Sequence, residues 1–303
     1  MIRRLLPFFD CRDSGLRWLA IALGIYVAIT SPHAHGQTAQ MDHISVTASG
    51  KGTPVLLIPG LSSPGETWAG VAAGLAAKHR VYVVQINGFG GDSPQANLQP
   101  GILAGAVTEL DAYLAKEHMH GAAVVGHSMG GLIALMLAKA HPGDVSRLMI
   151  VDALPWIGTL FGAQQVVQVE AQGKMLRDQM AAQYGKPNPA NDQAVAATNA
   201  LKPESRAKIA GWSAMADKRV AGQALFEDLT TDLRSDVASI AQPITLVVPY
   251  GGANSQMQAE AVYRAAYASA QHLALVAIGD SGHFAMLDQP AAFDQALTEF
   301  LAR

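Results

Sequence analysis

The chain is poor in cysteine and in charge. It has 303 residues and a single cysteine, Cys11, close to the amino terminus. One thiol cannot form an internal disulfide, and the rest of the sequence has no cysteine nucleophile and no thiolate ligand for a metal. Charged residues make up 15% of the sequence and the formal net charge is −3, with no long basic or acidic run. We therefore expect neither a nucleic-acid partner nor an anionic membrane surface as partner.

Sequence motifs that bind nucleotides or metals are also missing. No G-x-G-x-x-G pattern follows a predicted strand and opens a helix, and no P-loop pattern occurs. We interpret the glycine-rich stretch Gly88–Gly91 as a turn rather than a phosphate-binding loop. No group of histidine, aspartate and glutamate residues has the sequence spacing of a metal site. The sequence therefore predicts no cofactor and no metal.

The first 36 residues have the pattern of an export signal. Four arginines between positions 3 and 17 make this region positive. The apolar stretch Leu16–Thr30 is only about 15 residues long, whereas a membrane span needs about 20. Ala34 and Gly36 then offer the small residues of a cleavage site. We expect residues 1–36 to be a signal peptide of a periplasmic or secreted protein, and the alternative is an uncleaved membrane anchor.

From residue 43 onward, strand and helix patterns alternate. Short apolar runs such as Val55–Ile58, Val81–Ile86 and Ala122–Val125 predict buried strands, and stretches with helical spacing such as Leu103–Glu117 separate them. Strands separated by helices are typical of a mostly parallel sheet with helices on its faces. The sequence therefore predicts an α/β protein.

The alternation stops in one long segment. Residues 155–235 contain helical stretches without a clear strand, and regular order resumes at Ile244–Val248. We expect residues 37–154 and 236–303 to form the α/β core and residues 155–235 to form a helical cap over the carboxyl ends of the strands, where ligands bind in open α/β sheets. The alternative is a plain helical packing layer.

The most informative motif is Gly126-His127-Ser128-Met129-Gly130, which reads G-x-S-x-G. It lies between a predicted strand and a predicted helix, where a serine on a sharp turn is exposed for attack. Glycines suit both ends of so tight a turn because side chains would collide there. The pattern predicts that Ser128 is a nucleophile.

A serine nucleophile needs a base and an oxyanion hole. His283 follows the last predicted strand and lies well after the serine, in the chain order of serine, acid and histidine, so we expect it to be the base. Two backbone N–H groups are expected to hold the oxyanion: that of Met129, directly after the nucleophile, and that of Leu61, in the loop after the first buried strand. His127 is interpreted as a packing residue behind the site.

Four motifs together resemble the α/β-hydrolase fold superfamily, in particular esterase-like serine hydrolases with a cap domain. They are Leu57–Gly60, Asn87–Ser93, Gly126–Gly131, and Ser281–Phe284 with Leu287–Pro290. The resemblance extends over nearly all of the chain from residue 43. It implies an eight-stranded sheet with one antiparallel strand, a cap, and serine hydrolase chemistry on esters or related acyl bonds.

The third member of the expected triad has several candidates. Members of this superfamily usually carry the acid shortly after the seventh strand, where this chain has Asn254. An asparagine can orient an imidazole, but it cannot balance the charge of an imidazolium. Asp152, at the end of the strand after the nucleophile helix, is the preferred candidate. Asn254 and three further aspartates stay open as alternatives: Asp228, Asp232 and Asp280.

The sequence thus predicts a serine hydrolase that acts on carboxylic esters or a related acyl bond through an acyl-enzyme. The partner is a small-molecule acyl substrate, expected to be uncharged and fairly hydrophobic because the predicted cap is apolar. The apolar cap candidates are Leu154, Trp156, Ile157, Leu160, Phe161, Trp212 and Met215. Carbon–carbon bond hydrolysis, acyl transfer or perhydrolysis by the same triad are alternatives, as is a non-catalytic binding protein on this fold.

Overall fold

The computed structural model describes residues 37–303 of the chain. The predicted signal peptide and its cleavage site lie outside the described residues. None of the helices within residues 37–303 is long and apolar enough to cross a membrane.

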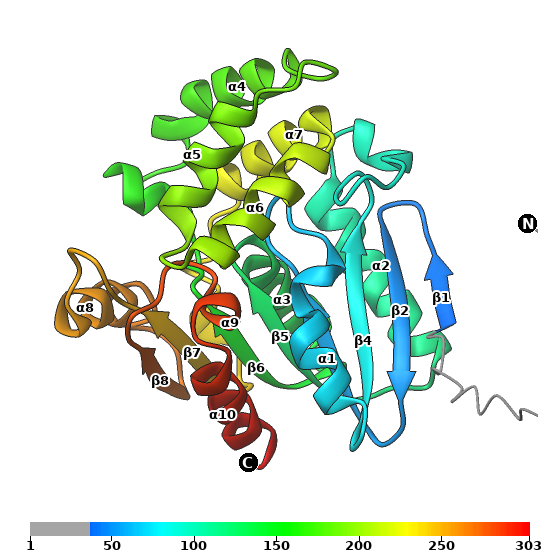
Figure 1. Cartoon of the computed structure of the whole chain (residues 1–303). Helices are drawn as coiled ribbons and strands as arrows, with labels where there is room; N and C mark the ends of the chain where they lie inside the picture. Colours follow the sequence, from blue (N-terminus) through cyan, green and yellow to red (C-terminus); the bar gives the residue numbers. More distant parts are fainter. Residues whose placement is uncertain (1–36) are drawn as a thin grey trace, which may run out of the picture. The chain divides into compact units, whose positions relative to one another are not determined.

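A single eight-stranded sheet forms the centre of the described chain (Figure 1). Its strand order is β1-β2-β4-β3-β5-β6-β7-β8. Strand β2 is antiparallel to both of its neighbours, and all pairs from β4 to β8 are parallel. The expected α/β fold, with one antiparallel strand among eight, is thereby confirmed. The strands are β1 (Gln37–Gln40), β2 (Ile44–Gly50), β3 (Thr53–Ile58), β4 (His79–Ile86), β5 (Ala122–His127), β6 (Val145–Val151), β7 (Ile244–Pro249) and β8 (Leu273–Ile278).

The central strands are buried on both faces, and their side chains alternate between two helical layers. In β3, Leu56 and Ile58 join one hydrophobic cluster, whereas Val55 and Leu57 join the other. This follows from the period of two in a strand, because successive side chains point to opposite faces. A strand covered by helices on both faces therefore needs a continuous apolar run.

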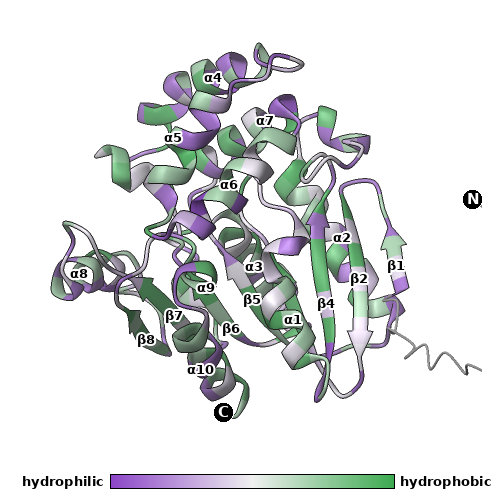
Figure 2. Ribbon diagram, viewed as in Figure 1, coloured by the Kyte–Doolittle hydropathy of each residue, from purple (hydrophilic) through white to green (hydrophobic). Residues whose placement is uncertain are grey.

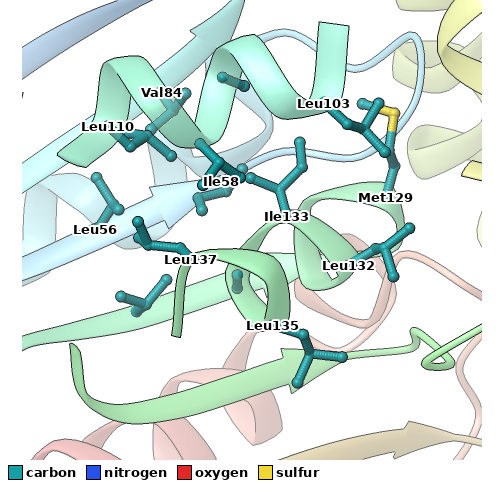
Figure 3. Close-up of a cluster of buried hydrophobic side chains, with 14 of the residues drawn as sticks. Leu56, Ile58, Val84, Leu103, Leu110, Met129, Leu132, Ile133, Leu135 and Leu137 are labelled. Atoms are coloured by element: carbon teal, nitrogen blue, oxygen red, sulfur yellow. The ribbon is translucent and has the colours of Figure 1, made fainter. Parts of the chain in front are cut away.

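Helices α2 (Ile102–Lys116) and α3 (Met129–Ala140) cover one face of the sheet. Figure 3 shows their leucines and isoleucines packed against side chains of β3 and β4. The other face is covered by α1 (Ala69–Leu75) and α10 (Pro290–Leu301), whose Val71 and Phe293 belong to the second cluster with Trp68. These two layers fix the sheet and hence the ends of its strands.

Residues 155–235 are helical, with no strand among them. They form a short 3₁₀ turn (Ile157–Phe161) and four helices: α4 (Val167–Ala181), α5 (Pro189–Asn199), α6 (Pro203–Met215) and α7 (Lys218–Thr230). Helix α4 packs on α7, and α5 packs on α6. In Figure 1 the four helices lie together beyond one end of the sheet. Figure 2 shows that they carry hydrophilic segments, whereas the central strands are largely hydrophobic.

Two elements were not expected from the sequence, the edge strand β1 and the helix α8 (Gln256–Ala266). Strand β1 consists of the polar residues Gln-Thr-Ala-Gln, so hydropathy does not reveal it. Helix α8 has no residue buried outright, but Ser255 and Gln258 form a capping box at its start. The remaining short helix, α9 (Ala285–Asp288), joins His283 to α10.

We expect Gly130→Ala to lower the free energy of unfolding by at least about 3 kcal/mol. A Cβ atom at Gly130 would lie 2.4 Å from the carbonyl oxygen of Ile58 and 2.5 Å from that of Pro59, and backbone cannot move aside as a side chain can. The matched control is Gly211→Ala in α6, where a Cβ meets nothing within 4 Å. It should stabilise the protein by about 0.5–1 kcal/mol. Equal effects of the two changes in urea unfolding would contradict this account of the turn.

Candidate active site

Ser128 occupies the turn between β5 and α3, with φ 54° and ψ −125°. A positive φ is unfavourable for a residue with a side chain, so the surrounding structure must hold it there. The Ser128 N–H donates to the carbonyl of Val151 at 3.0 Å, and the Gly131 N–H donates to the carbonyl of Ser128 at 2.7 Å. A Cβ atom at Gly126 would lie 2.2 Å from the carbonyl oxygen of Gly130. The turn therefore has the geometry that the G-x-S-x-G motif predicts.

His283 lies in the loop after β8 and contacts Asp152, which follows β6. The distance from His283 Nδ1 to Asp152 Oδ2 is 2.6 Å. With the proton of the neutral imidazole on Nδ1, donated to the carboxylate, the other ring nitrogen is left as a proton acceptor. The Asp152 N–H donates to the carbonyl of Val247 at 3.1 Å, and its second carboxylate oxygen accepts a hydrogen bond from the Tyr263 hydroxyl.

The other acid candidates lie elsewhere. Asn254 is exposed on the loop between β7 and α8, and its backbone N–H donates to the Gly251 carbonyl. Asp232 pairs with Arg234 at 2.7 Å. Asp280 is exposed. Asp228 is buried in α7, and no group in the described chain bonds its Oδ1 atom. Among the five candidates, Asp152 is thus the one hydrogen-bonded to His283 within residues 37–303.

His127 is hydrogen-bonded to the backbone of His283. Its side chain is fully buried, and its Nε2–H donates to the backbone carbonyl of His283 at 3.0 Å. Burial, and then the nearby charge of His283, hold the pKa of His127 well below its usual range, so the ring stays neutral. The two imidazole rings lie 4.5 Å apart between centroids. His127 is thus more than a packing residue, because its hydrogen bond fixes the loop that carries His283.

The two expected oxyanion donors flank the serine. A Cβ atom at Gly60 would lie 3.0 Å from Ser128 Cβ and 2.9 Å from His127 Nδ1, so the loop after β3 passes directly against the turn. Leu61 is the next residue, and Met129 opens α3. Neither the Leu61 N–H nor the Met129 N–H donates to a protein acceptor in the part of the chain that the structure describes. Their role as oxyanion donors stays a prediction, and it requires N–H groups that no protein acceptor occupies.

Ser128 and His283 line one cavity of about 440 Å³, between the sheet and the helices of residues 155–235. Its apolar wall comes from the loops of the core and from all four helices α4 to α7. The members are Leu61, Leu176, Met180, Val195, Ile209, Trp212, Leu225 and Phe284. Of the seven apolar cap residues considered from the sequence, Trp212 alone is in this lining. Leu160 and Phe161 are mostly exposed, whereas Trp156 is fully buried, donating to the Leu229 carbonyl.

The cavity has one lining residue with a formal charge, Lys218, at the start of α7. Its Nζ atom lies 3.2 Å from Asp192 Oδ1 and 2.7 Å from the carbonyl of Ser213. The Ser213 hydroxyl donates to the same carboxylate oxygen at 2.7 Å. This network joins α5, α6 and α7, and the buried carboxylate balances the positive charge.

A second group of titratable side chains was not anticipated. Asp111, His141 and Asp144 bring their ligand-type atoms within 4.8 Å of one another. Asp111 lies in α2, whereas His141 and Asp144 lie in the loop between α3 and β6. His141 Nδ1 lies 2.8 Å from Asp111 Oδ1. Burial, and then a hydrogen bond with Asp111, raise the pKa of Asp144. This group lies before the amino end of β6, whereas Ser128 lies at the opposite, carboxyl ends of the strands.

The parallel sheet, the serine turn after β5 and the histidine after β8 together define a protein of the α/β-hydrolase fold. A model of the alpha/beta hydrolase family matches residues 55–296, which is most of the chain. The chain belongs to this family.

Individual relatives are more distant. The chain is 35% identical over 112 residues to the pimeloyl-[acyl-carrier protein] methyl ester esterase of Aeromonas hydrophila, over 37% of this chain and only 42% of that protein. The protein of the same name from Vibrio cholerae is 26% identical over 269 residues, and the match covers 84% of this chain and 96% of the Vibrio protein. A bromoperoxidase from Bacillus anthracis has a TM-score of 0.72 at 17% identity, covering 88% of this chain and all of that one, which shows a shared fold alone.

The buried carboxyl of Asp228 predicts a pH dependence of stability. Burial raises its pKa to about 7, against the charge of His283, which lowers it. Unfolded, the group ionises above about pH 4. Between these values unfolding releases a proton, so the free energy of unfolding falls as the pH rises, by up to about 1.4 kcal/mol per pH unit. We expect the free energy of unfolding of Asp228→Asn, measured with urea, to fall less between pH 5 and pH 8 than that of the wild type, because the titrating carboxyl is gone.

The matched control for Asp228→Asn is Asp92→Asn, which changes an exposed carboxyl in a loop. It should leave the pH dependence of unfolding as in the wild type. An Asp228→Asn protein that loses stability with pH as steeply as the wild type would contradict the assignment.

Proposed function

We propose that the protein is a serine hydrolase in which Ser128 is the nucleophile, His283 the base and Asp152 the acid. The observation that carries the proposal is the 2.6 Å contact between His283 Nδ1 and Asp152, together with the cavity that Ser128 and His283 share. A carboxylate on one ring nitrogen leaves the other free to take the serine proton. It also balances the charge of the imidazolium that forms.

The reaction proceeds in two halves. The Ser128 oxygen attacks the acyl carbon as its proton passes to His283, and the N–H groups of Leu61 and Met129 stabilise the negative oxygen. The tetrahedral species collapses, the carbon–oxygen bond to the alcohol breaks, and His283 returns the proton to that alcohol. Water then attacks the acyl-enzyme with the same base, which releases the acid and regenerates Ser128.

The cavity favours a carboxylic ester with an uncharged, fairly hydrophobic acyl or alcohol part. Its apolar wall includes Trp212 and Phe284, and the charge of Lys218 is balanced by Asp192. Two relatives named as methyl ester esterases support ester hydrolysis as the reaction class. A cavity of about 440 Å³ is of the size that takes a small organic molecule.

Residues 155–235 act in this proposal as a cap that covers the acyl site. The four helices α4 to α7 all contribute side chains to the cavity wall, so the site is not formed by the core alone. We place the enzyme in the periplasm or outside the cell, on the sequence pattern of residues 1–36.

The first test is covalent labelling. A fluorophosphonate probe should label the wild-type protein, because it reacts with an activated serine, and the adduct mass should map to the peptide that contains Ser128. Ser128→Ala should not be labelled. Ser146→Ala, which alters an exposed serine in β6 outside this cavity, should be labelled like the wild type. Labelling that survives Ser128→Ala would rule out Ser128 as the nucleophile.

The second test is turnover of a p-nitrophenyl ester. We expect His283→Ala to lower kcat by at least about 1,000-fold, because the serine loses its general base. The matched control is His272→Ala, which removes an exposed histidine just before β8 and should retain wild-type kcat. Wild-type protein that neither turns over esters nor reacts with the probe would instead indicate a non-catalytic binding protein.

A further inference from the structure

We infer that Tyr263 is a positioning residue for Asp152: its hydroxyl holds one carboxylate oxygen so that the other stays on His283. The inference rests on the proposed function, in which Asp152 is the acid of the triad. It adds a residue from α8, a helix that contributes nothing to the cavity lining.

The contacts of Asp152 show why a second hydrogen bond matters. Oδ2 accepts from His283 Nδ1 at 2.6 Å, and Oδ1 accepts from the Tyr263 hydroxyl. A carboxylate bonded through one oxygen can still rotate about its side-chain torsions. Bonds to both oxygens from different directions restrict the carboxylate plane as well as its position. The side chain of Asp152 is only partly buried, so packing alone does not hold it.

The backbone conformation of Asp152 also needs support from neighbouring contacts. Its φ is 48°, in the left-handed region that side-chain-bearing residues adopt only when neighbouring contacts impose it. The segment at the end of β6 is tied on one side by the Asp152 N–H to the Val247 carbonyl. Helix α8 and the residue directly after it hold this segment on the other side, through hydrogen bonds to Asp152 and Ala153.

The first bond comes from Tyr263 in α8, and the second comes from Tyr267, the residue directly after the helix. The Tyr267 N–H donates to the Tyr263 carbonyl, so the last turn of α8 brings the two side chains to the same side. The Tyr267 hydroxyl donates to the carbonyl of Ala153 at 2.9 Å. Tyr267 is 1% exposed, and burial raises its pKa strongly, so it stays a neutral donor. Tyr267 anchors the backbone after β6, and Tyr263 orients the carboxylate.

The loop that leads into α8 carries Asn254, which is exposed. Among the described residues, no carboxylate between β7 and β8 is hydrogen-bonded to His283. In this inference the segment between the two strands acts on His283 indirectly, through the bond from Tyr263 to Asp152. Because Tyr263 does not line the cavity, its loss should change the alignment of His283 and leave substrate binding intact.

The test is Tyr263→Phe, which keeps the ring and its packing and removes only the hydroxyl. We expect kcat for a p-nitrophenyl ester to fall about tenfold with KM unchanged, as loss of a hydrogen bond to a charged group that acts on the transition state would give. Tyr113→Phe is the control, since it alters a buried tyrosine in α2 far from the site, and should leave both constants unchanged. Unchanged kcat in Tyr263→Phe would overturn the inference.

A double-mutant cycle separates positioning from general damage to the fold. If Tyr263 acts through Asp152, Tyr263→Phe should not lower kcat further in an Asp152→Ala background. The same tenfold loss in both backgrounds would overturn the inference, because the effect would then bypass the carboxylate. Full kcat in Asp152→Ala alone would instead contradict the proposed triad. A large loss in Asp152→Ala with none in Tyr263→Phe would overturn the role of Tyr263 only.

Discussion

The structure depends on a close approach of backbone around Ser128. The loop after β3 passes against the turn, and a side chain at Gly60, Gly126 or Gly130 would meet other atoms at 3.0 Å or less. The Ser128 N–H is also bonded to the carbonyl of Val151, the residue directly before Asp152. One compact turn therefore fixes the ends of β3, β5 and β6 relative to one another. The expected nucleophile directly follows β5 and the expected acid directly follows β6, and one expected oxyanion donor, Leu61, lies in the loop after β3.

A second buried contact links this turn to the end of β8. His127 lies beside Ser128 in the sequence but points into the protein, where it holds the carbonyl of His283. Because burial keeps His127 neutral, it brings no second charge next to His283, which becomes an imidazolium in the proposed mechanism. The proposed base and acid are thus each held by neighbouring groups. His127 bonds the backbone carbonyl of His283. The Val247 carbonyl accepts from the Asp152 N–H, and the Tyr263 hydroxyl donates to the second carboxylate oxygen of Asp152.

Much of this could be predicted from the sequence, for physical reasons that also explain the errors. The buried strands are continuous apolar runs, and the serine turn is local, so Val55–Ile58 and Ser128 could be identified from neighbouring residues. Contacts between distant segments leave no such local pattern.

The sequence offered several candidate acids for His283, and Asp152 was only one of them. The hydrogen bond from Tyr263 could not be predicted, because α8 is amphipathic and contains no buried residue. In residues 155–235, apolar character alone did not identify the cavity wall: Leu160 and Phe161 are apolar but mostly exposed. The group of Asp111, His141 and Asp144 has no recognisable sequence spacing, because Asp111 comes from α2 and the other two come from the loop between α3 and β6.

The central claim is that the acid of the triad is at 152, after the sixth strand, and not at 254. The most direct measurement is kcat of Asp152→Asn and of Asn254→Ala, side by side with the same ester. The account predicts a loss of about 10³- to 10⁴-fold for Asp152→Asn, because the imidazolium is left without a balancing charge, and wild-type kcat for Asn254→Ala. A large loss in Asn254→Ala with an active Asp152→Asn protein would contradict it.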